Sequence, residues 1–258
     1  MRAQYWDGQE FQTVPAILEA IGAADHAAPV VSVVGAGGKT TTIGRMVREA
    51  KKRGREALVF TTTHMREENC PWFTLESEEG KENRLEKIER LFQTYGSVCI
   101  GRAADGGKIT SISEPLRDIL LEKCREKGRI VLIEADGAKC LPLKVPAEHE
   151  PVILPESTHV LSLYGMDAVG GVMEEVCFRT TAAAKLLGKG EKERITPEDI
   201  ALLSASEAGG RKGCPLDAAY WVILNKADGG ERLTAAQKIC KILCDRGSKH
   251  VLVTGEEV

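Results

Sequence analysis

The stretch "VVSVVGAGGKTTT", residues 30–42, decides how the chain is expected to fold. Its apolar, β-branched first half predicts a buried strand, and the residues from about Thr40 to Lys52 predict an amphipathic helix. Between them, "GAGGKTT" has the Gly-Lys-Thr of a phosphate-binding loop, in the strand-to-helix context that such a loop requires. The usual motif has four residues between its first glycine and Gly-Lys, whereas Gly35 stands three positions before Gly38, so this loop is two residues short.

The chemistry of a phosphate loop survives this shortening. Unpaired N–H groups and a partial positive charge at a helix N-terminus attract a phosphate, and glycines let the backbone approach it closely. Lys39 can neutralise the terminal phosphates, and the Thr40 hydroxyl can ligate Mg²⁺. The alternative is a glycine-rich turn with an incidental lysine. We expect nucleotide binding through seven residues: Gly35, Ala36, Gly37, Gly38, Lys39, Thr40 and Thr41.

The composition is that of a globular protein without a strong charge bias. The chain has 258 residues, of which 43% are hydrophobic, and its net charge is −3. This balance predicts no nucleic-acid or membrane partner, and no apolar run reaches the length of a membrane span. The N-terminal residues lack the apolar core of a signal peptide, so we expect a cytoplasmic protein. None of the eight cysteines forms a C-x-x-C pair, and Cys70 is expected to be the most exposed of them.

Short apolar strands alternate with helical patterns, which predicts an α/β fold: a mostly parallel sheet with helices on both faces. Six stretches follow the first strand in this role: "ALVFTTT", "SVCIGR", "RIVLIEADG", "HVLSLYG", "AYWVILNKADG" and "KHVLVTG". We expect one domain over residues 1–258, with a helical extension over 1–28, a charged insertion over 65–95 and a helical insertion over 166–215. Thr196 is the expected N-cap of a helix in the last of these. The charged insertion has one helical face formed by Leu85, Ile88, Leu91 and Phe92.

Polar residues directly follow the second strand, in "TTTHM". Parallel sheets bind ligands at the carboxyl ends of their strands, so these side chains can contact the γ-phosphate, Mg²⁺ or a second substrate. We expect Thr62 and Thr63 to bind substrate and His64 to take part in catalysis. Threonines are also good strand formers, so edge packing and a solvent-facing histidine are the alternative.

The fourth strand ends in an acidic pair, within "IVLIEADGAKCLPLKVPAEHEP". Residues two apart in a strand point to the same face, so Glu134 and Asp136 are expected together beside the phosphate loop. Either can hold Mg²⁺ or its waters, and the other can orient water or a nucleophile. Together with Lys39 they are the catalytic candidates at this strand end. Lys139 and Lys144 follow in a proline-rich loop, where they either receive an anionic substrate or are solvated.

The stretch "VILNKADG" places N-K-x-D at the end of the sixth strand. A carboxylate at the last motif position accepts hydrogen bonds from the two N–H donors on the guanine edge. Adenine lacks these donors and would leave a buried carboxylate unpaired. We therefore expect purine recognition by Asn225, Lys226 and Asp228. The alternative is a polar strand end followed by an "ADG" turn.

Four segments together resemble the YqeC family: "VVGAGGKTTT", "VFTTTH", "LIEADGAKCLPLKVPAEHEP" and "VILNKADG". The resemblance runs from about residue 30 to residue 255, and the acidic segment is its most specific part. Members of this family are described as selenium cofactor biosynthesis proteins, or as accessory proteins of selenium-dependent molybdenum hydroxylases. The resemblance implies a P-loop NTPase type of fold, in agreement with the strand pattern.

The expected function is therefore a Mg²⁺-dependent nucleoside-triphosphate hydrolase, or a phosphoryl- or nucleotidyl-transfer enzyme. The resemblance implies that it matures the cofactor of a selenium-dependent molybdenum hydroxylase, with a selenium or molybdopterin compound or the hydroxylase as partner. One alternative is a nucleotide-switched chaperone of that hydroxylase, and another is an ATP-dependent small-molecule ligase or kinase. The short phosphate loop resembles that of the Mur ligase and folylpolyglutamate synthetase group and favours ATP, whereas N-K-x-D favours GTP.

Overall fold

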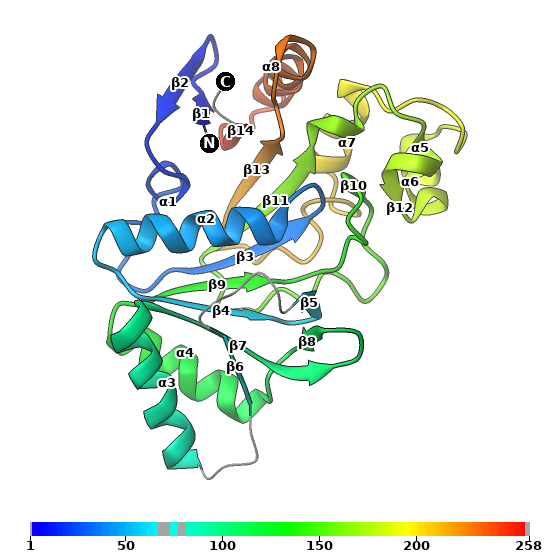
Figure 1. Cartoon of the computed structure of the whole chain (residues 1–258). Coiled ribbons are helices and arrows are strands. Elements are labelled where there is room, and N and C mark those ends of the chain that lie inside the picture. The colour runs from blue at the N-terminus through cyan, green and yellow to red at the C-terminus, as the bar shows by residue number, and fades with distance from the viewer. Residues whose placement is uncertain (1, 67–72, 77–80, 256–258) are drawn as a thin grey trace.

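Seven parallel strands form the middle of the sheet in the computed structural model, which describes residues 2–66, 73–76 and 81–255. They are β3 (Val30–Gly35), β4 (Ala57–Thr61), β7 (Ser97–Ala104), β9 (Ile130–Glu134), β11 (His159–Gly165), β13 (Ala219–Asn225) and β14 (Val251–Gly255). Their order across the sheet is β14-β13-β11-β3-β9-β4-β7 (Figure 1), and every neighbouring pair runs parallel. The predicted parallel sheet is confirmed, and the strand before the phosphate loop lies at its centre.

Antiparallel strands extend the sheet at both edges. One edge carries β1 (Arg2–Trp6), which pairs with β14, and then β2 (Phe11–Val14). The other edge carries β8 (Lys108–Thr110) and then β5 (His64–Arg66). The sequence predicts a helical extension over residues 1–28, and the structure differs, because a hairpin pairs with the open edge of β14. The expected helix there is a single turn, α1 (Ile17–Ala20).

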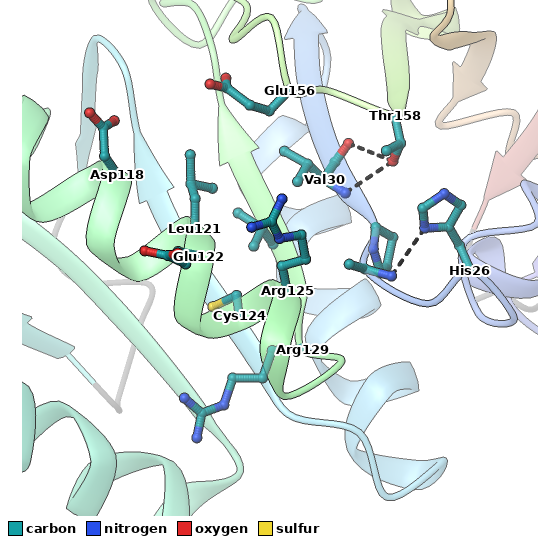
Figure 2. Close-up of a pocket in the computed structure, with 13 residues that line it drawn as sticks. His26, Val30, Asp118, Leu121, Glu122, Cys124, Arg125, Arg129, Glu156 and Thr158 are labelled. Atoms are coloured by element: carbon teal, nitrogen blue, oxygen red, sulfur yellow. Dashed lines mark hydrogen bonds between the residues drawn. The ribbon is translucent and has the colours of Figure 1, made fainter.

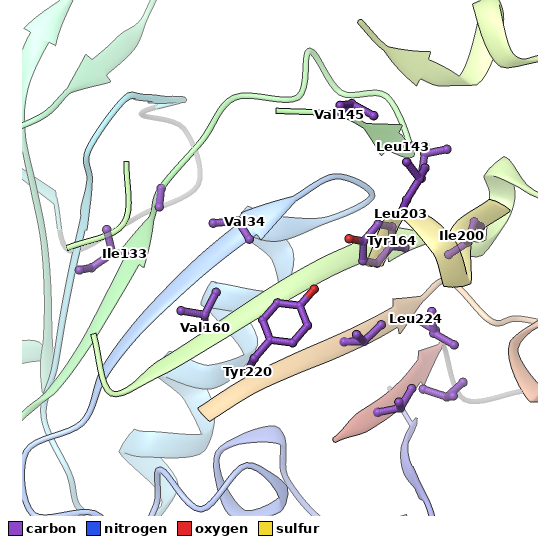
Figure 3. Packing of buried hydrophobic residues seen from close by; sticks show 14 of the residues in the cluster. Val34, Ile133, Leu143, Val145, Val160, Tyr164, Ile200, Leu203, Tyr220 and Leu224 are labelled. Atoms are coloured by element: carbon purple, nitrogen blue, oxygen red, sulfur yellow. The ribbon is translucent and has the colours of Figure 1, made fainter. Parts of the chain in front are cut away.

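Helices cover both faces of the sheet, as the sequence predicts. Because neighbouring residues of a strand point to opposite faces, Val33 packs with α1 and α2 (Lys39–Lys52), and Val34 packs on the other side. That second face is covered by four helices: α3 (Lys81–Tyr95), α4 (Glu114–Glu126), α7 (Pro197–Ala205) and α8 (Gly230–Asp245). Figure 3 shows part of this cluster, in which Tyr164 and Tyr220 lie with Val34. Among the described residues, no helix has the length and apolarity that crossing a membrane requires.

The stretch expected as a charged insertion belongs to the sheet and its helix layer. Its short strand β6 (Phe73–Leu75) pairs with β7, and α3 packs beneath the sheet. The predicted apolar face of this helix is confirmed, since Ile88 and Phe92 are buried, with Leu85 and Leu91 packed against the same cluster. The stretch differs from the expected insertion because its apolar face is needed to cover β7. Cys70 lies outside the described residues.

The helical insertion docks beside the acidic segment that follows β9. It contains η2 (Met166–Ala168), α5 (Met173–Val176), β12 (Cys177–Phe178), α6 (Thr180–Leu187) and α7. Strand β12 pairs in parallel with β10 (Leu143–Lys144), which joins the insertion to the acidic segment. The predicted N-cap of α7 is confirmed, because Thr196 and Asp199 form a capping box. Figure 1 shows α5, α6, β10 and β12 gathered together beyond the carboxyl ends of β3 and β11.

Candidate phosphate site

The glycine-rich loop joins β3 to α2 in a conformation that needs its glycines. Gly35, Gly37 and Gly38 have φ values of 88°, 84° and 122°, which L-residues with a β-carbon rarely adopt. At position 37 a β-carbon would also lie 3.0 Å from the carbonyl oxygen of Pro142 and closer still to the backbone of Gly165. The loop therefore lies directly against the end of β11 and the segment before β10.

Lys39, the lysine of the loop, is buried against an acidic partner. Its Nζ donates to the carbonyl oxygen of Gly35 at 2.8 Å and lies 3.1 Å from Oδ1 of Asp136. The other carboxylate oxygen of Asp136 accepts from the backbone N–H of Gly35 at 2.9 Å and lies 2.9 Å from Nζ of Lys144. The side chains of Lys39 and Asp136 are only 5% and 2% exposed. The structure thus brings the predicted lysine and aspartate together and adds a second lysine to them.

Glu134 reaches the first turn of α2 from the neighbouring strand. The Thr40 hydroxyl donates to Oε2 of Glu134 at 2.8 Å. Burial raises the pKa of Glu134, and the nearby Lys39 ammonium and the Thr40 hydrogen bond oppose that shift. Although β9 ends at Glu134, the carboxylates of Glu134 and Asp136 both meet the phosphate loop. The expected acidic pair is therefore assembled where the helix N-terminus begins.

Lys144 differs from the expected substrate contact because its ammonium group is fully engaged inside the protein. It donates to the carbonyl oxygen of Gly137 and to Oε2 of Glu150, both at 2.7 Å, besides its contact with Asp136. Its side chain is 1% exposed. An ammonium has three donors; two of them make these hydrogen bonds, and the group also lies in ion-pair contact with Asp136. Lys139 is exposed, with Nζ 4.9 Å from the ring centroid of Phe178.

Glu150 joins this cluster to the helical insertion. Arg179 donates to both of its carboxylate oxygens, at 2.8 Å and 2.9 Å. Burial opposes ionisation of Glu150, but the hydrogen bonds from Arg179 and Lys144 outweigh it and lower its pKa to about 2. Five charges of alternating sign therefore run from the insertion to the phosphate loop, in the order Arg179, Glu150, Lys144, Asp136 and Lys39.

Of Thr62, Thr63 and His64, which follow β4, only Thr62 makes a hydrogen bond to the acidic segment beside the phosphate loop in the described part of the chain. Thr62 donates its backbone N–H to the carbonyl oxygen of Glu134 at 3.2 Å and its hydroxyl to that of Val152 at 2.8 Å. The Thr63 hydroxyl is buried and has no hydrogen-bond partner among the described residues. His64 is exposed on β5 and, within the described ranges, makes no hydrogen bond or ion pair with the phosphate loop. A catalytic role of His64 stays a prediction.

Asn225 lies beside the phosphate loop and supports it. Its side-chain N–H donates to the carbonyl oxygen of Gly37 at 2.8 Å, and its side-chain oxygen accepts from the Thr254 hydroxyl at 2.7 Å. The residue is 6% exposed. In this arrangement both ends of the amide are used by the protein, so Asn225 ties the loop to β14 instead of facing a base.

Lys226 and Asp228 complete the motif at the edge where the parallel strands end. Lys226 has a φ of 60°, and its Nζ donates to Oδ2 of Asp167 at 2.7 Å. Asp228 lies against the end of β14, since a β-carbon on Gly255 would lie 2.6 Å from its Oδ1. Carboxyl ends of neighbouring parallel strands are where ligands bind in such sheets. The motif therefore lies at the carboxyl edge of the sheet beside the phosphate loop, and base recognition by Lys226 and Asp228 stays a prediction.

Several residues of this site have no recognisable signal in the sequence. Asp167 and Arg179 lie in the helical insertion, and their partners are 59 and 29 positions away in the chain. Thr254 sits in the short stretch "VTG" at the end of the last strand. Glu150 is part of the proline-rich acidic segment, whose unusual composition is the one available pointer. Long-range pairing of this kind leaves no local pattern to detect.

A larger cavity lies elsewhere in the described part of the chain. A space of about 440 Å³ opens at the amino ends of β3 and β9, beside α4, where Val30, Leu121 and Arg125 line it (Figure 2). None of the predicted site residues contributes to it. At the phosphate loop there is a void of only about 10 Å³, between Gly35, Lys144 and neighbouring residues, which is about the size of one water molecule.

A glycine-rich loop between a central strand and a helix, with one acidic residue at the end of the neighbouring strand and another just beyond it, defines a P-loop-type α/β protein. The family model described as "YqeC protein" matches residues 31–181, and the chain belongs to this family. It is 29% identical over 187 residues to the uncharacterized protein YqeC of Escherichia coli (strain K12), covering 72% of this chain and 71% of that protein.

Among solved structures, the chain is similar to the signal recognition particle 54 kDa protein of Aeropyrum pernix K1 in complex with GDP. The two are 16% identical with a TM-score of 0.43, and the match covers 93% of this chain. It covers 46% of that protein, so the chain spans less than half of it.

Proposed function

We propose that the chain binds a nucleoside triphosphate together with Mg²⁺ at the loop of residues 35–41. The observation that carries this proposal is the convergence of Lys39, Thr40, Glu134 and Asp136 on the first turn of α2. The N-terminus of this 14-residue helix supplies N–H groups and partial positive charge for phosphate oxygens. Lys39 adds a full positive charge beside them.

The residues present fit Mg²⁺ by the chemistry of their donors. Hydroxyl and carboxylate oxygens are hard ligands, which Mg²⁺ prefers. Thr40 and Glu134 lie in contact, and Oδ1 of Asp136 is a buried carboxylate oxygen that accepts no hydrogen bond within the described residues. Thr40 and Glu134 would hold the ion, with Asp136 holding it directly or through water. A bound Mg²⁺ would neutralise negative charge on the phosphate oxygens.

We propose GTP as the preferred nucleotide. Asn225 joins the N-K-x-D motif to the phosphate loop through its hydrogen bond to Gly37, which supports placing the base of a bound nucleotide near Lys226 and Asp228. The Asp228 carboxylate would accept from the guanine N–H groups, which adenine lacks. The short loop favours ATP by its resemblance to the Mur ligase group, and we give more weight to the N-K-x-D motif because it lies directly beside the loop.

We propose hydrolysis or phosphoryl transfer as the reaction, in the maturation of a selenium-containing molybdenum hydroxylase cofactor. The cellular role rests on the resemblance to the YqeC family described above. Glu134 and Asp136 would orient the attacking water or acceptor. Thr62 bonds Glu134 through its backbone, and the segment after Lys139 contacts Gly37, so Thr62, Thr63 and Lys139 are the candidates for substrate contact. His64 would act on the second substrate from β5.

A nucleotide-switched chaperone is the second candidate, and one observation favours it. The helical insertion contacts the phosphate loop through a continuous chain of ion pairs, so a change at the loop can alter how the insertion docks. Turnover would then act as a timer on a client hydroxylase. An ATP-dependent ligase or kinase would instead require a small-molecule acceptor.

The proposal is tested by equilibrium binding of fluorescent GTP and ATP analogues in Mg²⁺. We expect Lys39→Met to weaken binding at least about tenfold, since it removes the charge that faces the phosphates. Lys52→Met is the control, because Lys52 lies exposed at the far end of α2. Equal affinities of the wild type and Lys39→Met would contradict the site.

The reaction is tested by measuring turnover with candidate partners. Phosphate release is followed alone, with selenide, with molybdopterin cytosine dinucleotide and with a molybdenum hydroxylase. A modified small-molecule product supports the transfer enzyme, whereas stimulation by the hydroxylase alone supports the switch. If none of these additives changes the rate or the product, both the transfer enzyme and the switch are contradicted.

A further inference from the structure

Lys144 holds the most enclosed charge of the cluster, and the proposed function gives it no role. Its three donors face Asp136, Gly137 and Glu150 at 2.7–2.9 Å. With 1% of its side chain exposed, it cannot turn outward to meet a substrate without breaking all three contacts. Lys144 is therefore a fixed positive charge behind the phosphate loop.

Asp136 contacts two lysines, and Lys39 is held by fewer other groups than Lys144. Its Oδ2 is held by Lys144 and by the Gly35 N–H, and its Oδ1 faces Lys39. Lys39 belongs to the loop itself and has one further acceptor, the Gly35 carbonyl oxygen. For Lys39 to reach a phosphate, it must give up at least part of its contact with Asp136. A buried carboxylate left without a counter-ion is strongly unfavourable.

We propose that Lys144 is the positioning residue that releases Lys39 for the nucleotide. It keeps Asp136 neutralised when Lys39 exchanges the carboxylate for phosphate oxygens, so the exchange leaves no unpaired buried charge. Glu150 and Arg179 hold Lys144 in place, which makes nucleotide affinity depend on the docked insertion. This inference rests on the proposed nucleotide site and deepens it.

The test compares nucleotide affinity in three variants: Lys144→Met, Asp136→Asn and the double variant. Without Lys144, Asp136 retains Lys39, so we expect the dissociation constant for the GTP analogue to rise at least about tenfold. In the double variant Lys39 is not paired with a carboxylate, so binding requires no ion pair to break. We expect its dissociation constant to lie within about threefold of that of Asp136→Asn alone. The nucleotide titrations are done in EDTA, which removes Mg²⁺, so that loss of the proposed metal contact of Asp136 does not affect the comparison.

Two controls separate this role from loss of structure. Lys189→Met removes another partly enclosed ion pair, with Asp199, that does not touch the phosphate loop, and it should leave affinity unchanged. The second control is the rate at which acetic anhydride labels Lys39, read by mass spectrometry without nucleotide. Unfolding would speed this labelling, whereas the proposal predicts slower labelling in Lys144→Met and faster labelling in Asp136→Asn.

The outcomes distinguish this inference from the proposed function. If the wild type binds nucleotide, Lys39→Met does not, and Lys144→Met binds as the wild type does, the inference is overturned and the site stands. A double variant that binds as weakly as Lys144→Met also overturns it. If neither the wild type nor Lys39→Met binds, the proposed function fails, and Lys39 labelling still shows whether Lys144 governs the lysine. Unchanged or faster labelling in Lys144→Met contradicts the inference in either case.

Discussion

Single residues of the phosphate loop are constrained from two directions, by backbone conformation and by space. Gly37 combines a φ of 84° with close approach of Gly165 and Pro142. Gly54, after α2, has a φ of 68° but no atom within 4 Å of where a β-carbon would be. Comparing substitutions at Gly37 and Gly54 therefore separates the energetic cost of a left-handed backbone conformation from the cost of steric overlap.

We expect Gly37→Ala to lower the free energy of unfolding by about 3 kcal/mol, since strain and overlap add. Gly54→Ala, which meets only the conformational cost, should lose about 1 kcal/mol. Urea denaturation of both variants measures the difference. Similar losses in the two would show that the loop is not packed against the end of β11 as described.

Glu134 is proposed to serve the metal site, but its buried carboxylate lowers the stability of the fold when it is ionised. Burial raises its pKa, so folding disfavours the ionised form, and this cost appears as the pH rises above the ordinary value of 4.5. We expect Glu134→Gln, which keeps an acceptor for Thr40, to raise the melting temperature at pH 7 but not at pH 4. It should also abolish Mg²⁺-dependent turnover. A lower melting temperature at pH 7 would contradict the assigned environment.

The sequence predicts those helices and strands whose residues form a local pattern, such as an apolar run or a capping motif. It does not predict elements whose structure depends on distant partners. The seven parallel strands are apolar runs, and Thr196 marks the start of α7 by local capping chemistry. Strands β1, β2, β5 and β8 are short and mixed in polarity, and their pairing depends on the open edges of the sheet. The acidic pair and the loop lysine were predictable for the same local reasons, whereas Arg179 was not.

Helix α3 is fixed to the sheet by an ion pair that pH can break. Hydrogen bonds from Arg129 lower the pKa of Glu89 to about 2, against the opposing effect of burial and with help from Lys127. A carboxyl with a lowered pKa contributes stability above its ordinary value of 4.5 and loses it as the pH falls toward 2. Arg129 also lies 3.7 Å from the ring centroid of Phe92, so it packs on the same helix.

We expect Glu89→Gln to cost about 2 kcal/mol of unfolding free energy at pH 7 and progressively less between pH 4.5 and 2. Denaturant unfolding across this range measures the slope. Glu86→Gln is the control on the same helix, because Glu86 is 68% exposed and pairs only with Arg90 in the described part of the chain. An unchanged acid dependence in Glu89→Gln would contradict the pairing.

Over the whole molecule, the proposed nucleotide site spans the carboxyl edge of the sheet from β9 to β14. The proposed phosphate, metal and base positions come from chain segments that are far apart in sequence and meet because β9, β3, β11, β13 and β14 are neighbours. The helical insertion closes this edge through β12 and Arg179. The architecture therefore allows base identity and insertion docking to act on one phosphate loop.

Base choice is a property of this whole arrangement. We expect Asp228→Asn to weaken GTP binding at least about tenfold and to leave ATP binding unchanged, because the carboxylate is needed only for the guanine donors. Asp217→Asn, in the exposed segment before β13, is the matched control. Competition titrations with both nucleotides give the ratio. Equal effects on GTP and ATP would remove the case for guanine.

The central claim is tested most directly by a crystal structure with Mg²⁺ and a non-hydrolysable GTP analogue. The account predicts triphosphate density at residues 35–41, the metal beside Thr40 and Glu134, and Lys39 on phosphate oxygens while Lys144 keeps Asp136. Triphosphate density at another place, or Lys39 still paired with Asp136 beside a bound nucleotide, would contradict it.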